Sequence, residues 1–219
     1  MPLSALNVIY GLVYHIDMAT ASKPSAAPTT LRDLTVRAVR AEVSAVAMRL
    51  FIEQGFEKTT VDQIAAEAGM SRTSFFRYFA TKEEVVLGHL DEIASRILDG
   101  LVARPESEPV WKSLRRAFDS LIEETAASPE EHLRMARMLK DTPALKVRQL
   151  GKQLGWHDVL GPEVARRLHV AADARDPRPR ALVAAAMACL NVAVETWTAA
   201  DGAIDLSTLV DQAMDAPVG

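Results

Sequence analysis

The chain has 219 residues, of which 49% are apolar and 25% are charged, enough to bury a substantial core in one or two domains. Its net charge of −4 excludes a generally polybasic surface, so any contact with nucleic acid has to come from a local patch. The single cysteine, Cys189, excludes an internal disulfide and a pair of thiolate metal ligands. We therefore expect a globular cytoplasmic protein in which Cys189 is a small core residue.

Residues 1–34 are predicted to be a disordered leader or linker. Leu3 to Ile16 is apolar, yet no Lys or Arg precedes this run and it is too short to span a bilayer, so no membrane contact is expected. The following "ATASKPSAAPTT" has the composition of a linker. Met1 and Met18 both remain possible start sites.

The helical period begins at Thr35 and continues to the C-terminus. An apolar stripe at i, i+3, i+4 spacing runs from Val36 to Leu50 and predicts a helix that closes at Gly55. Thr60 is followed three residues later by Gln63, a pair that can satisfy the free amides of a short second helix reciprocally.

A second glycine and two further caps divide the next segment. Gly69 is predicted to supply the left-handed turn that ends the second helix. Ser71 caps a third helix that runs to about Phe79, and the sequence 81–84 caps a long fourth helix that continues to about Leu101. Two short helices joined by a glycine turn and docked on a longer one have the geometry of a helix-turn-helix.

Residues from about 37 to 97 resemble the DNA-binding domain of TetR-family transcriptional regulators. The resemblance runs almost continuously through "LFIEQGFEKTTVDQIAAEAGMSRTSFFRYFATKEEVV". It implies an all-α protein with an N-terminal helix-turn-helix domain at residues 35–100, its motif at about 60–79. A C-terminal helical domain for ligand binding and dimerisation follows at residues 101–219, with about nine helices in all.

The third helix gathers rings and positive charge, since residues 71–82 hold three cations and no carboxylate. Phe75 and Phe79, four residues apart, share one side and are expected in the core. The resemblance assigns base contacts to the start of this helix and phosphate contacts to the surrounding positions. The implied DNA-binding residues are Arg40, Thr60, Arg72, Thr73, Ser74, Phe76, Arg77, Tyr78 and Lys82. Many relatives carry Tyr where this chain has Phe76, so a hydroxyl that could reach a phosphate is missing here.

The C-terminal segment is helical again. An amphipathic helix spans residues 111–125, another begins at Ser128-Pro129, and a third restarts at Thr142-Pro143 and is expected to be kinked or broken by its glycines. Residues 172–180 read as a linker loop before a helix from about Pro179 to Ala200. A last helix is predicted around residues 206–213.

The resemblance implies that this segment encloses an effector pocket and pairs with a second copy of the chain. The candidate pocket residues are mostly apolar: Trp111, Phe118, Met135, Met138, Leu139, Trp156, Met187 and Asn191. The candidate dimer residues form a stripe of small side chains on the penultimate helix and the apolar face of the last one: Ala186, Cys189, Ala193, Thr196, Leu206, Leu209, Val210 and Ala213.

The sequence thus favours a one-component regulator, most simply a repressor that binds a palindromic operator as a homodimer and is released by a small apolar effector. "KDTPAL" and the tryptophan of "VETWTAA" are similar to regulators with acyl thioester-like effectors. A DNA-binding architectural or partner-recruiting protein without an effector is one alternative; a helical enzyme using Asn191 and Glu195 is another. Neither metal nor cofactor is expected, because the five histidines lack ligand spacing and no phosphate-cradling glycine loop is present.

Overall fold

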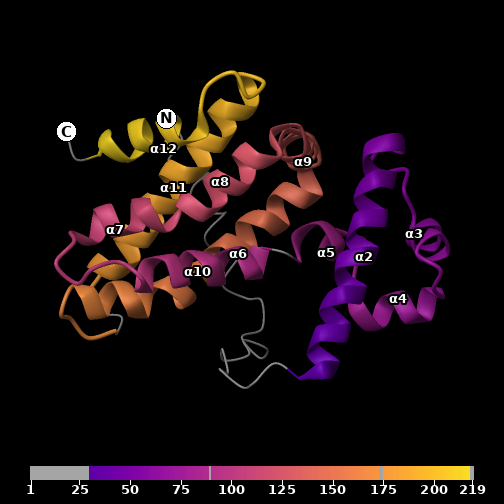
Figure 1. Ribbon diagram of the computed structural model, residues 1–219, viewed down its shortest axis with the longest axis horizontal. Coiled ribbons are helices and arrows are strands. Elements are labelled where there is room, and N and C mark those ends of the chain that lie inside the picture. The colour runs from indigo at the N-terminus through magenta and orange to yellow at the C-terminus, as the bar shows by residue number, and fades with distance from the viewer. Residues whose placement is uncertain (1–29, 89, 173–174, 218–219) are drawn as a thin grey trace, which may run out of the picture. The chain divides into compact units, whose positions relative to one another are not determined.

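The computed structural model describes residues 30–88, 90–172 and 175–217 (Figure 1). Helices are the only regular secondary structure in these ranges, which confirms the all-α prediction. The chain divides into two compact units, residues 1–41 and residues 42–219. Most of the predicted leader lies outside the described residues, but the first helix begins at Leu31, inside the predicted linker.

One long helix and three short ones follow one another in the N-terminal part. They are α2 (Leu31–Gln54), α3 (Val61–Glu67), α4 (Arg72–Tyr78) and α5 (Lys82–Leu87). Local chemistry sets their ends as predicted: Gly55 and Gly69 take positive φ values of 88° and 66° after α2 and α3. Thr60 and Gln63 form the reciprocal capping box of α3, and the Ser71 hydroxyl accepts the amide of Ser74 at the start of α4.

Seven helices make up the rest of the described chain. They are α6 (Leu90–Val102), α7 (Val110–Ala117), α8 (Asp119–Ala127), α9 (Pro129–Asp141), α10 (Pro143–Arg167), α11 (Arg178–Ala199) and α12 (Leu206–Asp215). Eleven helices are therefore present in the described ranges. Two predicted helices are each divided, the fourth around Gly88 into α5 and α6, and the one at 111–125 into α7 and α8.

The division at Phe118 has a backbone cause. Its amide donates to the carbonyl of Arg115, 3.2 Å away, and its carbonyl accepts the amide of Leu121, 3.0 Å away. Both bonds span three residues, so the chain tightens locally where α7 ends and α8 begins. Phe118 is fully buried at this corner.

Of the two outcomes predicted for this helix, a kink or a break, the break is wrong, because α10 runs uninterrupted through Gly151, Gly155 and Pro162. Pro162 removes one backbone donor, but Leu160, Gly161 and Val164 beside it are buried, and their packing maintains the helix.

α11 packs against α7, α9, α10 and α12 and forms the centre of the C-terminal helices (Figure 1). By length and composition alone it could cross a membrane, and 44% of its most apolar window is buried inside the structure. Core helices of soluble proteins have the same composition, and the contacts of α11 on four neighbours fit that role.

Candidate nucleic-acid interface

Two buried rings fix the orientation of α4. Phe75 and Phe79 are 0% and 2% exposed, their ring centroids lie 5.3 Å apart, and they pack into the same core as Ile64 and Ala65 of α3. Turning these rings inward leaves the opposite side of α4 in solvent. The predicted helix-turn-helix core is thus confirmed.

The structure places four of the predicted DNA-binding residues on that outer side of α4. Arg72, Thr73, Phe76 and Arg77 are exposed on α4, and Thr60 is exposed at the start of α3. Ser74 and Tyr78 are half-buried at the edges of this face, and the Ser74 hydroxyl hydrogen-bonds that of Ser71. Arg40 is half-buried and belongs to the other compact unit.

Arg72 is held in place by two neighbours. Its Nη1 donates to Oδ2 of Asp62 at 2.7 Å, and its guanidinium carbon lies 5.5 Å from the centroid of the Phe76 ring. Asp62 was not a candidate from the sequence, because an acid in the first turn of a helix is already explained by the helix dipole. Its proximity to Arg72 arises from the turn at Gly69.

Lys82 is occupied by the protein itself. Its ammonium donates to the carbonyl oxygens of Phe56 at 2.9 Å and Thr59 at 3.2 Å, and it lies 4.3 Å from the centroid of the Phe56 ring. It therefore stabilises the corner between α2 and α3. The phosphate contact proposed for it has to use the remaining donor.

Residues 80–84 join the motif to the C-terminal helices. The Thr81 hydroxyl accepts the amide of Glu84 and also a hydrogen bond from Nη1 of Arg148 on α10, at 3.1 Å. The Glu84 carboxylate accepts the amide of Ala80, one residue before the position expected for a reciprocal cap. The contact of Arg148 could not be predicted from the sequence, because its partner Thr81 is 67 residues away.

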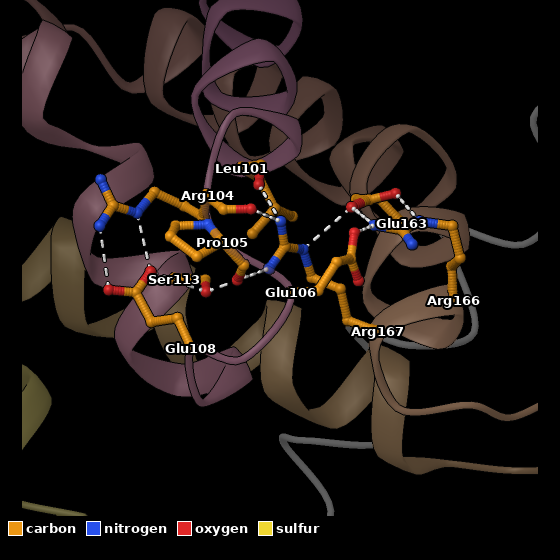
Figure 2. A network of polar contacts seen from close by, with 9 residues as sticks. All are labelled: Leu101, Arg104, Pro105, Glu106, Glu108, Ser113, Glu163, Arg166 and Arg167. Carbon is orange, nitrogen blue, oxygen red and sulfur yellow. Dashed lines mark hydrogen bonds and ion pairs between the residues drawn. The ribbon is translucent and has the colours of Figure 1, made fainter.

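Arg167 closes the far end of α6 (Figure 2). Its side chain is 1% exposed and donates to the carbonyl oxygens of Leu101 and Arg104, each at 2.7 Å, and of Pro105 at 3.2 Å. Glu163 accepts from its Nε at 2.9 Å. One buried cation thus caps the α6 C-terminus, where the free carbonyls and the helix dipole favour positive charge.

Carboxylates balance the charge around Arg167. Arg166 donates to both Glu163 and Glu106, and Arg104 donates to Glu108 (Figure 2). These hydrogen bonds to arginine hold the pKa values of Glu163, Glu106 and Glu108 below the usual range for a glutamate. The network ties the α6–α7 turn to the end of α10.

The candidate effector residues are buried or half-buried among α7 to α11. Phe118, Trp156 and Met187 are buried; Trp111, Met135, Met138, Leu139 and Asn191 are half-buried. The amides of Asn191 and Gln153 bond each other reciprocally, at 3.1 and 3.2 Å, and Trp111 donates its Nε1 to the carbonyl of Met214 at 3.0 Å. Trp156 Nε1 is buried without a hydrogen-bond partner among the described residues.

A small cavity of about 120 Å³ lies elsewhere, between α8, α11 and α12. Its lining comprises Ile122, Thr125, Ala126, Pro129, Trp197, Gly202, Ile204, Asp205 and Leu206. None of the eight candidate pocket residues lines it. It is also smaller than the roughly 300–1,000 Å³ of sites for drug-sized ligands.

Most candidate dimer residues lie inside the chain. Ala186, Cys189, Ala193, Leu206, Leu209 and Val210 are buried, Ala213 is half-buried and Thr196 is exposed. The small stripe of α11 therefore packs on the chain's own helices, because close helix crossing is needed within the subunit too. The exposed face of α11 carries Ala184, Ala188 and Val192 instead, and pairing with a second copy stays a prediction.

Comparisons with known proteins agree with this architecture. Residues 43–88 match the family model of bacterial regulatory proteins of the tetR family, and residues 108–217 match that of the MftR C-terminal domain. The HTH-type transcriptional regulator TcmR of Streptomyces glaucescens is 32% identical over 192 residues, which cover 83% of this chain and 84% of TcmR. The putative mycofactocin biosynthesis regulator MftR of Mycobacterium tuberculosis is 31% identical over 129 residues, 57% of this chain and 63% of that protein.

Solved structures show the same fold. FadR of Thermus thermophilus, a TetR-family repressor in complex with lauroyl-CoA, aligns with a TM-score of 0.55 and 24% identity over 82% of this chain and 93% of its own. A TetR-family regulator from Syntrophomonas wolfei aligns with a TM-score of 0.59 and 17% identity, covering 84% of this chain and 96% of its own. The helix-turn-helix, the two family models and TcmR together place the chain: it belongs to the TetR family and is a DNA-binding transcriptional regulator, not an enzyme.

Proposed function

We propose that this regulator is a cytoplasmic homodimeric repressor that binds a palindromic operator through α4 and is released by a small apolar effector. The observation that carries the DNA-binding part is the two-sided character of α4, with Phe75 and Phe79 buried and Arg72, Thr73 and Arg77 exposed. A helix fixed on one side with cations and hydroxyls on the other is suited to the major groove.

Within this proposal the outer residues divide between base and backbone contacts. Arg72, Thr73 and Ser74 stand at the start of α4, the end that reaches base edges in a helix-turn-helix. Five further residues would position the motif on phosphate and sugar: Thr60, Phe76, Arg77, Tyr78 and Lys82. Arg40, in the other compact unit, is a separate candidate for a phosphate contact.

A homodimer supplies the second reading helix that a palindromic operator requires. The described chain leaves apolar side chains exposed on two adjacent helices, Val147, Leu150 and Leu154 on α10 and Val192 on α11. The helices are joined by the Gln153–Asn191 amide pair and by a Lys146–Glu195 ion pair. This apolar surface supports a partner subunit more directly than the buried small stripe does.

An acyl thioester is the effector class that we favour. Two FadR structures of this fold, from Thermus thermophilus and Bacillus subtilis, hold lauroyl-CoA and stearoyl-CoA. In this chain the unpaired Nε1 of Trp156 is a buried donor that a carbonyl oxygen of the ligand could satisfy. A long acyl chain would suit the apolar, adaptable side chains of the candidate residues Met135, Met138 and Met187.

The proposal is tested by selecting bound duplexes from a random DNA library and then titrating the complex with lauroyl-CoA and stearoyl-CoA. We expect a two-fold symmetric sequence to be selected and acyl-CoA to release it. Trp156→Phe keeps an aromatic side chain, although a smaller one, and removes the donor, so it should weaken acyl-CoA-induced release while operator affinity stays unchanged. DNA binding that neither thioester alters would favour the architectural alternative.

A further inference from the structure

We propose that Asp62 is a positioning residue that determines specificity by fixing the Arg72 guanidinium for one base pair of the operator. This inference rests on the proposed placement of α4 in the major groove. The observation behind it is that the Asp62 carboxylate of α3, the Arg72 guanidinium of α4 and the exposed Phe76 ring lie next to one another.

The geometry orients Arg72 from two sides. The carboxylate of Asp62 accepts from Nη1 at 2.7 Å, and the Phe76 ring lies 5.5 Å from the guanidinium carbon. Among the described residues, Nε and Nη2 of Arg72 have no protein acceptor. Two adjacent N–H groups of one planar fork therefore remain for O6 and N7 of a guanine, and the ion pair sets the direction in which they point.

Stability does not explain the pair. The two side chains are 60% and 63% exposed, and exposed ion pairs add little to folding stability. The contact between α3 and α4 is already secured by buried Ile64, Ala65 and Phe75. A carboxylate on a face that meets phosphates opposes DNA binding by its negative charge. The contribution of Asp62 to binding therefore has to come from orienting the Arg72 guanidinium.

The base preferences of five proteins test this role: wild type, Asp62→Asn, Arg72→Ala, the double variant, and Glu67→Gln. Glu67 is the matched control, because it also lies on α3 and pairs with an arginine, Arg49, but that arginine is on α2. Each protein is used to select duplexes from a random library, and affinities are then measured on the preferred duplex and on its single-base variants.

We expect Arg72→Ala to lose discrimination at one symmetric pair of positions by about 5- to 150-fold, the range of one bidentate base contact. Asp62→Asn should lose part of that discrimination, about 3- to 10-fold, at the same positions, while its affinity for unrelated DNA rises. In the Arg72→Ala background the Asp62 substitution should change no base preference, since its partner is gone. Glu67→Gln should leave all preferences unchanged.

Two results would overturn the inference while the proposed function stands. One is an Asp62→Asn protein with the wild-type preferences and uniformly tighter binding. The other is a loss of discrimination at positions that Arg72→Ala does not affect. A wild-type protein that selects no sequence would instead overturn the proposed function, and this inference with it.

Discussion

Phe76 is an apolar ring left 44% exposed on a face otherwise made of cations and hydroxyls. It meets Phe75 edge-on, with ring centroids 5.5 Å apart, and it lies beside the guanidinium of Arg72. The ring is therefore not part of the core, and a change at its outer edge should leave the fold unaffected.

Phe76→Tyr adds a hydroxyl on this exposed edge. If the ring lies against the DNA backbone, one hydrogen bond to a charged phosphate should raise operator affinity up to about tenfold per half-site. The preferred sequence and the salt dependence should not move, because the contact is to phosphate and adds no cation. Fluorescence anisotropy at several salt concentrations measures all three, and a lowered melting temperature without a gain in affinity would contradict the expectation.

Lys82 provides a second prediction at the residue scale, since its ammonium joins two backbone carbonyls of the α2–α3 corner. Lys82→Met should lower the free energy of unfolding by about 1–2 kcal/mol, reduced from the value of a buried charged hydrogen bond because the group is partly exposed. Lys58→Met is the control, an exposed lysine of the same corner. Equal melting temperatures for the two variants would show that the carbonyl contacts contribute nothing.

Arg167 holds the end of α6 through hydrogen bonds to three backbone carbonyls and an ion pair with Glu163. Arg167→Met should reduce the free energy of unfolding by about 3–5 kcal/mol, because Glu163 loses its buried partner and three carbonyls lose their donor. Arg166→Met, next to it and 50% exposed, should cost far less stability, because exposed ion pairs are screened by solvent. The two free energies are compared by urea unfolding. Similar unfolding midpoints for the two variants would show that the contacts of Arg167 do not stabilise the fold more than those of Arg166.

The carboxylates of this network predict a dependence on acid. The arginine hydrogen bonds lower the pKa of Glu163 in the folded protein, so the unfolded chain takes up its proton first as the pH falls. The stabilisation from Glu163 is present above its ordinary pKa of about 4.5 and is lost as the pH falls through the folded value. Glu163→Gln should flatten the pH dependence of the unfolding midpoint below this pH, whereas Glu131→Gln, at an exposed position of α9, should not.

The elements of the helix-turn-helix could be predicted because their signals are local. The contacts between residues far apart in the sequence could not be predicted. Thr60, Gly69 and Ser71 act within three or four residues, so their caps and turn can be read from the sequence. Arg167 reads as a surface residue at a helix end, and only carbonyls more than sixty residues away make it a buried cap. Asp62 was missed for a related reason, because its pairing with Arg72 depends on how the turn folds α4 back toward α3.

At the scale of the whole molecule, the burial of the small stripe changes how dimerisation should be tested. Ala193 is 1% exposed, so an arginine there would disrupt the subunit's own core and reveal nothing about a partner. Val192, 56% exposed on the outer face of α11, is the better position.

Val192→Arg should weaken self-association without unfolding the subunit, because it places a charge on the exposed apolar surface of α10 and α11. We expect a dimer dissociation constant raised by about tenfold or more, measured by sedimentation at several concentrations. Val102→Arg, at an equally exposed position on α6, should have no effect. An unchanged constant for Val192→Arg would exclude this surface from the interface.

The Arg167 cap also has a mechanical consequence. Because the C-terminus of α6 is hydrogen-bonded to Arg167 of α10, we expect α6 to respond to a change in the helices around it by tilting rather than by sliding. Thirteen residues make a lever of roughly 20 Å, so a tilt of about 5° moves the opposite end, where α5 joins, by roughly 1.7 Å. α10 connects both regions, because its Arg148 contacts Thr81 at the start of α5 and its Arg167 contacts the C-terminus of α6. We therefore expect the pivot at the C-terminal end of α6 and the greatest displacement at the end that adjoins the helix-turn-helix.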